Sequence, residues 1–581
     1  MACLVFEEGP KPPRPAVQKK QLLPHIVDGM ARSRPEAVYA EYPSNPDTYA
    51  DGFTNLTYGA FANVVNGLAW FLEDRLGPGD QFETLVYFGP NDFRQNALVL
   101  AACKAGYKLL LCSPRNTVTG YKALFNALGV KTLLAAGSPH LPIVSTIMLE
   151  HNLGLLSIAS CDQLLGIKYP HYPYDKRFAE AGNEPLLVLH TSGTTALPKP
   201  IVITHNWVSS WVHALHKDPP LGTESLDRLH QGNRVLVMMP PFHGGNLMPT
   251  LFDAVHNQST IIFPLPCAIL SPDHFHEHFI ACVRDARPDI ALLPAGFIHE
   301  IAQDPALLAL AAKHLEYIFY TGGDVANIYG NAVSQRVKLF NVNGSTELAS
   351  YPALRPSSSS GGTGSWDRTI WKYIMPHPIA GIEFRCHSWD NGDAKYEAVV
   401  VRNAMADDLQ PVFSVFPSCV EYRSGDLFSP HPCIAGLWVY RGRADDCFVL
   451  VTGSNINPLA MESHVGAHPE VKTALMVGQR RPQPGLLIEL EEEIQAEEEP
   501  ALAGGTDQQQ SPGRRLALVE RFWPAIERGN QEYYDLARVA KDRVIFTVPG
   551  RPMKRTPKGS VQRRATYDLY EEDIEQMYSA A

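Results

Sequence analysis

A short stretch rich in hydroxyl side chains carries the clearest chemical signal in the sequence. Residues 189–200 read LHTSGTTALPKP and place four hydroxyl side chains around Gly193, with a lysine near the end. An apolar, strand-like segment lies on each side, which predicts a polar loop between two buried strands. Hydroxyl and backbone N–H groups donate to phosphate oxygens, a glycine lets the backbone approach closely, and a lysine adds positive charge. The predicted ligands of a polyphosphate are Thr191, Ser192, Gly193, Thr194, Thr195 and Lys199.

An ordinary Ser/Thr turn would use the same residue types, so the loop alone leaves both explanations open. The P-loop of nucleotide hydrolases is excluded, because no GxxxxGK(S/T) pattern occurs in the sequence. The loop resembles the phosphate-binding signature of the adenylate-forming enzymes, which is roughly (S/T)(S/T)G(S/T)TGxPK. Ala196 stands where that signature usually has a second glycine, a change that removes no hydrogen-bond donor. This superfamily comprises acyl-CoA ligases, the adenylation domains of peptide synthetases, and luciferases.

A histidine motif resembles the region of the superfamily that binds the carboxylic acid. His243 lies in MMPPFHGGNL, and in acyl- and aryl-CoA ligases and acid reductases the matching histidine lies near the carboxylate of the acid. An imidazole could donate to that oxygen while it attacks phosphorus, although a histidine that only caps a loop would look the same. Domains specific for α-amino acids carry an Asp in this region, and here none follows Phe242 directly. The resemblance implies an acid without an α-amino group and a pocket formed by His243, Ala295, Gly296 and Phe297.

Two glycine-containing motifs resemble the sites for adenine, phosphate and metal. Residues 321–324 (TGGD) follow a predicted strand, and in the superfamily this turn lies against the adenine ring. Residues 341–347 (NVNGSTE) resemble YGxTE, which implies that Thr346 contacts the α-phosphate and Glu347 binds Mg²⁺. The motif begins with Asn–Val–Asn in place of the usual aromatic residue, so the ring that normally stacks on adenine is missing from this motif. The nucleotide-binding residues implied by these motifs are Gly322, Gly323, Asp324, Asn341, Asn343, Gly344 and Ser345.

Two motifs nearer the C-terminus resemble the ribose-binding and hinge motifs. YRSGD ends at Asp426, whose two carboxylate oxygens would accept from both ribose hydroxyls. YRGRADD resembles GRxDD, which implies that Arg443 contacts ribose or phosphate. The same motif implies that Asp445 is the hinge between two domains.

The catalytic lysine of the superfamily has no direct counterpart in this sequence. The segment VPGRPMKRTPKGSVQRRA resembles the lysine loop PKxxxGKIxR, but Ser560 occupies the usual lysine position. A basic side chain is needed to bridge the carboxylate of the acid and the α-phosphate as charge builds. We predict that Lys558 has this role, with Lys554 as the alternative, and a solvated basic tail is the non-catalytic explanation.

Strand-like and helix-like segments alternate from about residue 22 to residue 262, which predicts parallel sheets covered by helices. One of the predicted helices covers residues 60–76 and ends at Gly77. We expect an α/β fold with a large N-terminal adenylation domain of parallel-sheet αβ layers and a small C-terminal α/β lid domain. The expected domain ranges are residues 21–442 and 443–581, and the expected flexible segments are residues 1–20 and about 489–513.

The composition excludes several other classes of protein. The 581 residues carry a net charge of −11, from 50 basic and 61 acidic residues, without a dense basic stripe, which argues against nucleic-acid binding. No apolar run reaches the ~18–20 residues of a membrane span, and the first 20 residues lack the apolar core of a signal peptide. The ten cysteines are scattered without a CxxC pair, which predicts reduced thiols and a cytoplasmic location.

The ordered motifs imply an enzyme that uses ATP and Mg²⁺ to convert an aryl or other non-α-amino carboxylic acid into an acyl-adenylate and pyrophosphate. The segments LTYGAFANVVNGLAWFL, LCSPRNT and TPKGSVQRR resemble the adenylation domains of fungal peptide-synthetase-like carboxylic acid reductases, which implies a place in secondary metabolism. The implied second step transfers the acyl group to a thiol, either coenzyme A or the phosphopantetheine of a carrier protein. Since the chain has no carrier segment and no GxGxxG, a separate carrier protein or reductase is the expected partner.

Two alternatives to this interpretation stay open. An acyl- or aryl-CoA ligase would carry the same motifs and use coenzyme A as the acceptor, and an amine is a further acceptor that the motifs allow. A degenerate nucleotide-binding protein without catalytic activity would explain the departures at Ala196, Asn341 and Ser560.

Overall fold

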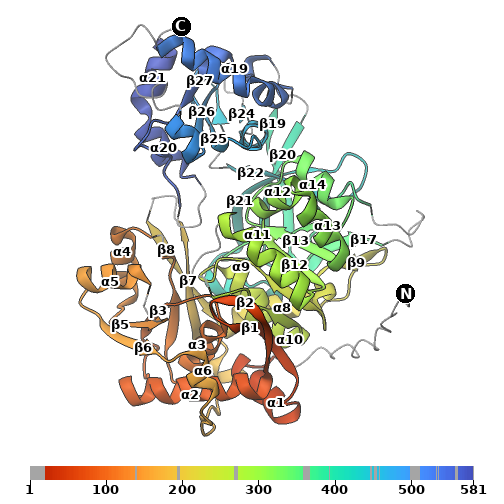
Figure 1. Ribbon diagram of the computed structural model, residues 1–581. Coiled ribbons are helices and arrows are strands. Elements are labelled where there is room, and N and C mark those ends of the chain that lie inside the picture. The colour runs from red at the N-terminus through yellow and green to blue at the C-terminus, as the bar shows by residue number, and fades with distance from the viewer. Residues whose placement is uncertain are drawn as a thin grey trace, which may run out of the picture. The chain divides into compact units, whose positions relative to one another are not determined.

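A computed structural model of the chain forms two compact units (Figure 1). The larger unit comprises residues 1–322, 333–381 and 402–420, and the smaller unit comprises residues 323–332, 382–401 and 421–581. The domain boundary at residues 442 and 443 stays a prediction. The structure describes residues 20–114, 116–137, 141–192, 197–266, 272–357, 367–390, 393–444, 448–450, 455–456, 458–497, 511–531, 533, 535–556 and 561–579.

The larger unit contains a seven-stranded sheet with the order β14-β13-β12-β10-β11-β1-β2. All neighbouring strands in it are parallel except β1 and β2, which form an antiparallel hairpin. The strands are β1 (Val38–Asn45), β2 (Thr48–Thr57), β10 (Arg234–Val237), β11 (Thr260–Ile262), β12 (Ile290–Pro294), β13 (Tyr317–Thr321) and β14 (Lys338–Asn341).

A second sheet of the larger unit has six strands in the order β6-β5-β3-β4-β7-β8. Its neighbours are parallel except β7 and β8. The strands are β3 (Thr84–Phe88), β4 (Lys108–Leu111), β5 (Thr132–Ala136), β6 (Gly154–Ile158), β7 (Pro185–Ser192) and β8 (Pro198–Thr204). Every residue of β3, TLVYF, is buried, as expected for a parallel strand covered on both faces. The predicted α/β fold with parallel-sheet layers is therefore confirmed.

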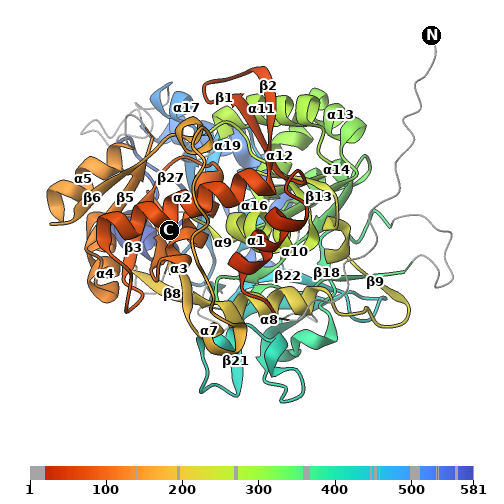
Figure 2. The ribbon, with the colours of Figure 1, turned by 90° about the horizontal axis from the view of Figure 1, so that it is seen from below.

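The helices of the larger unit begin and end at the signals that the sequence contains. In α2 the Thr57 hydroxyl accepts from Ala60 N–H at 3.2 Å, and the helix ends at Gly77, whose φ is +81°. Figure 2 shows α4 and α5 at one side of this unit and α11 to α13 at the other, with α2 between them. The helices are α1 (Leu23–Ser33), α2 (Tyr58–Leu76), α3 (Phe93–Lys104), α4 (Val118–Leu128), α5 (Pro142–Glu150), α6 (Cys161–Leu165), α7 (Phe178–Ala181), α8 (His205–Leu215), α9 (Gly244–Leu247), α10 (Ala254–Asn257), α11 (Pro272–Ala281), α12 (Ala295–Gln303), α13 (Pro305–His314) and α15 (Val412–Val415).

A buried ion pair joins the first three helices. The Lys104 ammonium on α3 lies 2.9 Å from both carboxylate oxygens of Asp28 on α1 and 3.0 Å from Asn66 Oδ1 on α2. The Lys104 side chain is 0% exposed. Burial lowers its pKa, and the charge of Asp28 opposes that effect. Removal of one partner would leave a charge in an apolar interior.

Asp28→Ala is expected to lower the free energy of unfolding by about 3 kcal/mol, because it leaves the Lys104 ammonium buried without a counter-ion. Urea denaturation of the variant and the wild type measures this loss. The double variant Asp28→Leu with Lys104→Met should recover most of it. Glu316→Ala, which removes the exposed ion pair with Lys338, is the matched control and should cost less than about 1 kcal/mol. An Asp28→Ala variant as stable as the control would contradict the assignment.

The smaller unit contains an antiparallel sheet and a mixed sheet. In the first, β22, β21, β20 and β19 follow one another in that order. The second joins β25 to β26 antiparallel and β26 to β27 parallel. The elements are β19 (Ile382–Asp390), β20 (Asp393–Val401), β21 (Glu421–Pro430), β22 (Trp438–Arg443), β25 (Val471–Val477), β26 (Gly485–Leu490), β27 (Val544–Phe546), α16 (Leu459–Gly466), α17 (Glu492–Glu497), α19 (Ser511–Asn530), α20 (Arg563–Leu569) and α21 (Glu571–Ser579).

Alternating side chains of β26 pack on opposite faces of the mixed sheet. Leu486 and Ile488 join the core that contains Phe522 of α19, whereas Leu487 joins the core that contains Ile574 of α21. The period of two therefore places helices on both faces of the sheet. Within the described part of the chain, no helix is both long and apolar enough to cross a membrane.

Candidate active site

His243 is held by the backbone of the helix that it begins. It is the N-cap of α9, and its Nδ1 accepts a hydrogen bond from the Gly245 N–H at 2.9 Å. An accepting nitrogen carries no proton, so the proton of the neutral ring lies on Nε2. The histidine therefore does cap a turn, which was the alternative to a role at the acid. The same hydrogen bond leaves Nε2 as the nitrogen that donates.

Gly245 leaves little room beside this ring. A Cβ added at residue 245 would lie 2.9 Å from His243 Nδ1 and 3.1 Å from Met239 Cε. Both distances are shorter than the 3.5–4.0 Å at which non-bonded atoms attract most strongly. A side chain at this position must therefore displace the imidazole or Met239.

The predicted phosphate loop joins two antiparallel strands of the second sheet. β7 ends at Ser192, β8 begins at Pro198, and Thr191 lies opposite Lys199 across the pair. A loop does lie between two strands, but the strands extend further than predicted, so Thr191, Ser192 and Lys199 belong to β7 and β8 rather than to the loop. The candidates that lie outside the described residues are Gly193, Thr194 and Thr195, together with the side chain of Ser192.

A short hairpin presents Thr346 and Glu347 in the larger unit. Its strands, β15 (Gly344–Ser345) and β16 (Ala349–Ser350), are antiparallel. A Cβ at Gly344 would lie 2.2 Å from the Ala349 carbonyl oxygen, so only glycine permits this pairing. The hairpin thus explains the glycine of the NVNGSTE motif by sterics. Thr346 is buried, and Glu347 is half-buried.

Two tryptophans of α8 hold this hairpin in place. Trp207 Nε1 donates to the Glu347 carbonyl oxygen at 3.0 Å. Trp211 Nε1 donates to Ser350 O and Oγ at 3.2 Å each. The backbone of Glu347 is therefore fixed while its carboxylate, among the described residues, forms no ion pair. No motif pointed to these tryptophans, because partners about 140 residues apart produce no local pattern.

The other nucleotide-binding candidates of the larger unit follow β13 and end β14. Gly322 comes directly after β13 and has a φ of +84°, in the left-handed region that favours glycine. Asn341 Nδ2 donates to the Lys372 carbonyl oxygen at 3.2 Å, so this side chain supports the backbone. Asn343 Nδ2 is buried and has no hydrogen-bond partner among the described residues, which makes it a donor that a nucleotide could use.

The predicted pocket segment forms the start of α12. Phe297 is 6% exposed and stacks on Phe275 of α11, with ring centroids 4.0 Å apart. Ala295 is also buried, and Gly296 is exposed. The ring of Phe297 thus contributes to helix packing, and the role of this segment in an acid pocket stays a prediction.

The smaller unit brings Asp426 and Arg443 together. They are opposite each other on β21 and β22, with Arg443 Nη1 3.3 Å from Asp426 Oδ1. Gly425 has a φ of +73°, and a Cβ there would lie 2.8 Å from Arg443 Nη2. The pair gives the carboxylate a fixed position beside a cation. Gly323 and Asp324 also belong to this unit, and the predicted hinge Asp445 lies outside the described residues.

The two candidate lysines lie in or beside one loop of the smaller unit. An antiparallel bridge between Arg555 and Val561 closes this loop. Lys554 lies at its base, where its N–H donates to Thr566 Oγ1 at 3.1 Å and its carbonyl accepts from Gln562 N–H at 2.7 Å. Lys558 is within the loop and outside the described residues, so the choice between the lysines stays a prediction.

Comparison with known protein families gives two matches that cover most of the chain. The model of AMP-binding enzymes matches residues 31–373, and the model of the AMP-binding enzyme C-terminal domain matches residues 445–581. A carboxylic acid reductase of Neurospora crassa is 29% identical over 571 residues, covering 97% of this chain and 51% of the relative. Adenylate-forming reductase Nps11 of Serpula lacrymans is 24% identical, covering 97% of this chain and 50% of the relative. The chain thus spans about half the length of these curated relatives.

Solved structures share the fold. The amide bond synthetase McbA of Marinactinospora thermotolerans has a TM-score of 0.64 at 16% identity, covering 94% of this chain and 99% of that one. The ATP-bound MatB of Rhodopseudomonas palustris has a TM-score of 0.64 at 16% identity, covering 95% and 99%. Both agree with the predicted arrangement of a large N-terminal and a small C-terminal domain.

Proposed function

Because the chain belongs to the AMP-binding enzyme family, we propose that it uses ATP to activate a carboxylic acid as an acyl-adenylate. A carboxylate oxygen bonds to the α-phosphorus of ATP, the bond from that phosphorus to the bridging oxygen of the β-phosphate breaks, and pyrophosphate leaves. The step needs no protein nucleophile, so its rate depends on positioning and charge neutralisation. The observation that carries the proposal is the fixed donor geometry of His243 in the motif expected at the acid.

The larger unit supplies groups for both reactants. His243 Nε2–H would donate to the carboxylate and orient the attacking oxygen, because its Nδ1 is held by Gly245 N–H. Thr346 would donate its hydroxyl to the α-phosphate. Glu347 fits a Mg²⁺ ligand, because it is a carboxylate on a hairpin whose backbone is fixed by Trp207, and phosphate oxygens complete the oxygen set that Mg²⁺ prefers. When bound, the ion supplies charge neutralisation for the triphosphate.

The smaller unit contributes the ribose and lysine groups of the proposal. The Asp426 carboxylate would accept from the ribose hydroxyls, with Arg443 at 3.3 Å balancing its charge. Lys558 would bridge the acid and the α-phosphate. In the other described parts of the site, Thr191, Lys199, Gly322 and Asn343 would contact the nucleotide.

We propose an aryl or other non-α-amino acid as the substrate and a thiol as the final acceptor. No aspartate follows Phe242 directly to pair with a substrate ammonium, and Asp253, further along, is buried and paired with His230, which supports the first point. The thiol acceptor is supported only by the similarity of the chain to reductases and ligases, since both kinds of enzyme pass on an activated acyl group. A phosphopantetheine carrier, coenzyme A or a separate reductase would then receive it. The proposed setting is fungal secondary metabolism in the cytoplasm, in agreement with seven free cysteines among the described residues.

Pyrophosphate release with hydroxylamine as the trap tests the proposal directly. The panel should contain aryl, aliphatic and α-amino acids, each with Mg²⁺ and ATP. We expect an aryl or aliphatic acid to give pyrophosphate release and the matching hydroxamate. Repeating the assay with coenzyme A, and testing for the acyl-CoA product, distinguishes a CoA ligase from a carrier-loading enzyme. If no acid of the panel causes pyrophosphate release although ATP still binds, a degenerate nucleotide-binding protein would be favoured instead.

Gly245→Ala is expected to slow pyrophosphate release about tenfold, because the added methyl group displaces the His243 ring from its cap. ATP binding should be unchanged. Steady-state rates and calorimetric ATP titration measure the two effects. Gly296→Ala is the matched control, since a Cβ there meets nothing within 4 Å. Equal rates for both variants would show that the position of the ring does not matter.

A further inference from the structure

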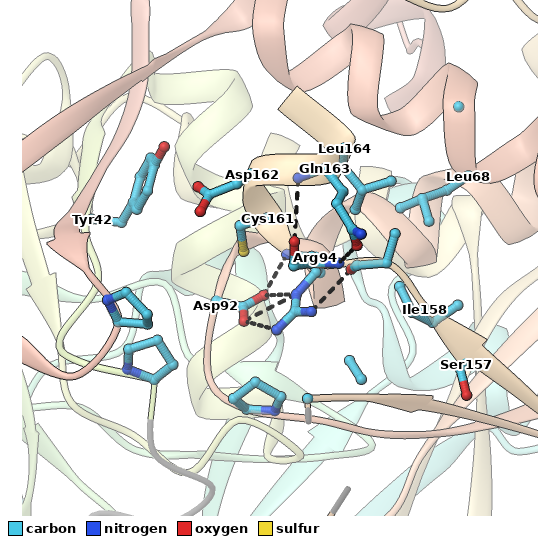
Figure 3. Close-up of a pocket in the computed structure, with 18 of the residues that line it drawn as sticks. Tyr42, Leu68, Asp92, Arg94, Ser157, Ile158, Cys161, Asp162, Gln163 and Leu164 are labelled. Atoms are coloured by element: carbon cyan, nitrogen blue, oxygen red, sulfur yellow. Dashed lines mark hydrogen bonds and ion pairs between the residues drawn. The ribbon is translucent and has the colours of Figure 1, made fainter. Parts of the chain in front are cut away.

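A cavity of about 1120 Å³ lies in the larger unit, and none of the residues assigned above to ATP or the acid lines it (Figure 3). It lies beyond the carboxyl ends of β3, β5 and β6, with Pro90, Ala136 and Ile158 in its wall. Phe263, directly after β11 of the first sheet, lines another part. The chain runs from β3 to β4 and then returns to β5 on the opposite side of β3. Ligands of parallel sheets bind at the carboxyl ends of strands where such a reversal occurs.

The one cationic side chain among the described lining residues is already paired. Arg94 Nη2 lies 2.6 Å from Asp92 Oδ2, and its Nε lies 3.0 Å from Asp92 Oδ1. Arg94 Nη1 donates in addition to the Ala159 carbonyl oxygen at 3.1 Å. The two side chains are 7% and 5% exposed. This buried pair (Figure 3) therefore neutralises itself and gives the wall polarity without net charge.

The remaining charged groups of the lining are acidic. Asp47, Asp74 and Asp162 are exposed carboxylates, and Asp74 is paired with Arg75, whose Nε lies 3.6 Å from Asp74 Oδ2. Asp162 lies near Tyr42 and Cys161, as Figure 3 shows. Burial raises the pKa of Tyr42 to about 12, with smaller contributions from Cys161 and Asp162, so its hydroxyl stays protonated at neutral pH. Asp47 and Asp162 thus give the lining an excess of negative charge, which repels a carboxylic acid and attracts a cation.

Aromatic rings supply a second attraction for a cation. Trp70 is held in place by a hydrogen bond from its Nε1 to the Pro170 carbonyl oxygen at 3.0 Å. Tyr169 lies against the helix backbone, because a Cβ at Gly67 would be 2.5 Å from its ring. The rings that line the cavity are Tyr42, Trp70, Phe71, Tyr169 and Phe263, and of these Phe71 already has the Arg75 guanidinium 5.9 Å from its centroid. The faces of such rings attract ammonium groups, and tryptophan does so most strongly.

We propose that this cavity binds a small organic cation, a primary ammonium attached to an aromatic or alicyclic ring. The ring packs on the apolar wall, and the ammonium lies beside Asp162 and the ring of Tyr42. The cavity of about 1120 Å³ is slightly larger than the roughly 300–1,000 Å³ of small-molecule pockets, so a compact ligand occupies one part of it. The site is independent of adenylation, because the acid substrate carries the opposite charge.

Calorimetric titration with two probes of the same ring and similar length tests the proposal. Phenethylammonium is expected to bind more tightly than 2-phenylethanol. Asp162→Asn should weaken phenethylammonium about three- to fivefold and leave 2-phenylethanol unchanged. Asp80→Asn, an exposed aspartate outside the lining, is the matched control and should change neither.

A steric variant separates this cavity from other sites. Ala159→Trp places a large ring in the cavity wall, three residues from Asp162, without changing charge, so it should weaken binding of both phenethylammonium and 2-phenylethanol while pyrophosphate release is retained. Equal affinity for the two probes, or amine binding unaffected by both Asp162→Asn and Ala159→Trp, would overturn the proposal. Asp162→Asn alters an exposed side chain, so its titration decides the matter even where Ala159→Trp does not fold.

Discussion

Lys558→Ala is expected to slow acyl-adenylate formation by ~10²–10³-fold, because it removes the cation that bridges the acid and the α-phosphate as charge develops. ATP binding should be retained, since the phosphate loop and Asp426 are unchanged. Pyrophosphate release under saturating substrates measures the rate, and calorimetry measures ATP binding. A loss in rate without a loss in affinity is the signature of a group that acts in the transition state.

Lys554→Ala is the control for this prediction. The backbone of Lys554 is bound to Thr566 and Gln562 at the base of the loop, so truncation of its exposed side chain should leave the loop intact and the rate within about threefold of wild type. The reverse outcome, a large loss with Lys554→Ala and none with Lys558→Ala, would assign catalysis to Lys554. No loss with either variant would remove the lysine from the mechanism.

Glu347→Gln is expected to slow the same reaction about 100-fold and to raise the Mg²⁺ concentration needed for half the maximal rate. An amide oxygen is a weaker ligand than a carboxylate for a hard cation. The hairpin should keep its shape, because Trp207 binds the carbonyl oxygen of residue 347 and not its side chain.

A Mg²⁺ titration of the pyrophosphate-release rate separates the two effects of this substitution. Glu316→Gln, at an exposed surface pair with Lys338, is the matched control and should match wild type. An unchanged Mg²⁺ dependence in Glu347→Gln would show that residue 347 is not the metal ligand.

Local patterns predicted the sheets and several helices well. Residues 60–76 were expected to be helical up to Gly77, and α2 ends at Leu76 as the glycine requires. The helix begins two residues earlier, because the Thr57 hydroxyl caps it. Strands were expected to alternate with helices up to about residue 262, and the parallel strands found there include the fully buried run TLVYF of β3. In contrast, the six π-helical residues at 248–253 carry no pattern that separates them from an α-helix.

Site residues could be proposed from the sequence only where the chemistry lies within one short motif, and their roles stay predictions. The glycine of NVNGSTE and the histidine of PPFHGG lie in such motifs, and the close contacts that a Cβ would make explain why glycine stands at positions 344 and 245. Long-range contacts could not be predicted. The indole bond from Trp207 to residue 347 joins distant segments, as does the wall that brings Trp70 and Phe263 to one cavity. Such contacts depend on how whole sheets stack, which no single motif records.

The hydrogen bonds from Trp207 and Trp211 to the 344–350 hairpin give the chain a built-in optical reporter. The emission of an indole depends on the hydrogen bond and the charge at its ring nitrogen, and here that nitrogen touches the backbone beside the proposed metal ligand. Occupancy of the hairpin would thus change tryptophan fluorescence without a label or a coupled assay. Since the chain has eight tryptophans, the difference between wild type and Trp207→Phe isolates this signal. The same contact that fixes the hairpin would then make ligand arrival visible in real time, in a stopped-flow fluorimeter.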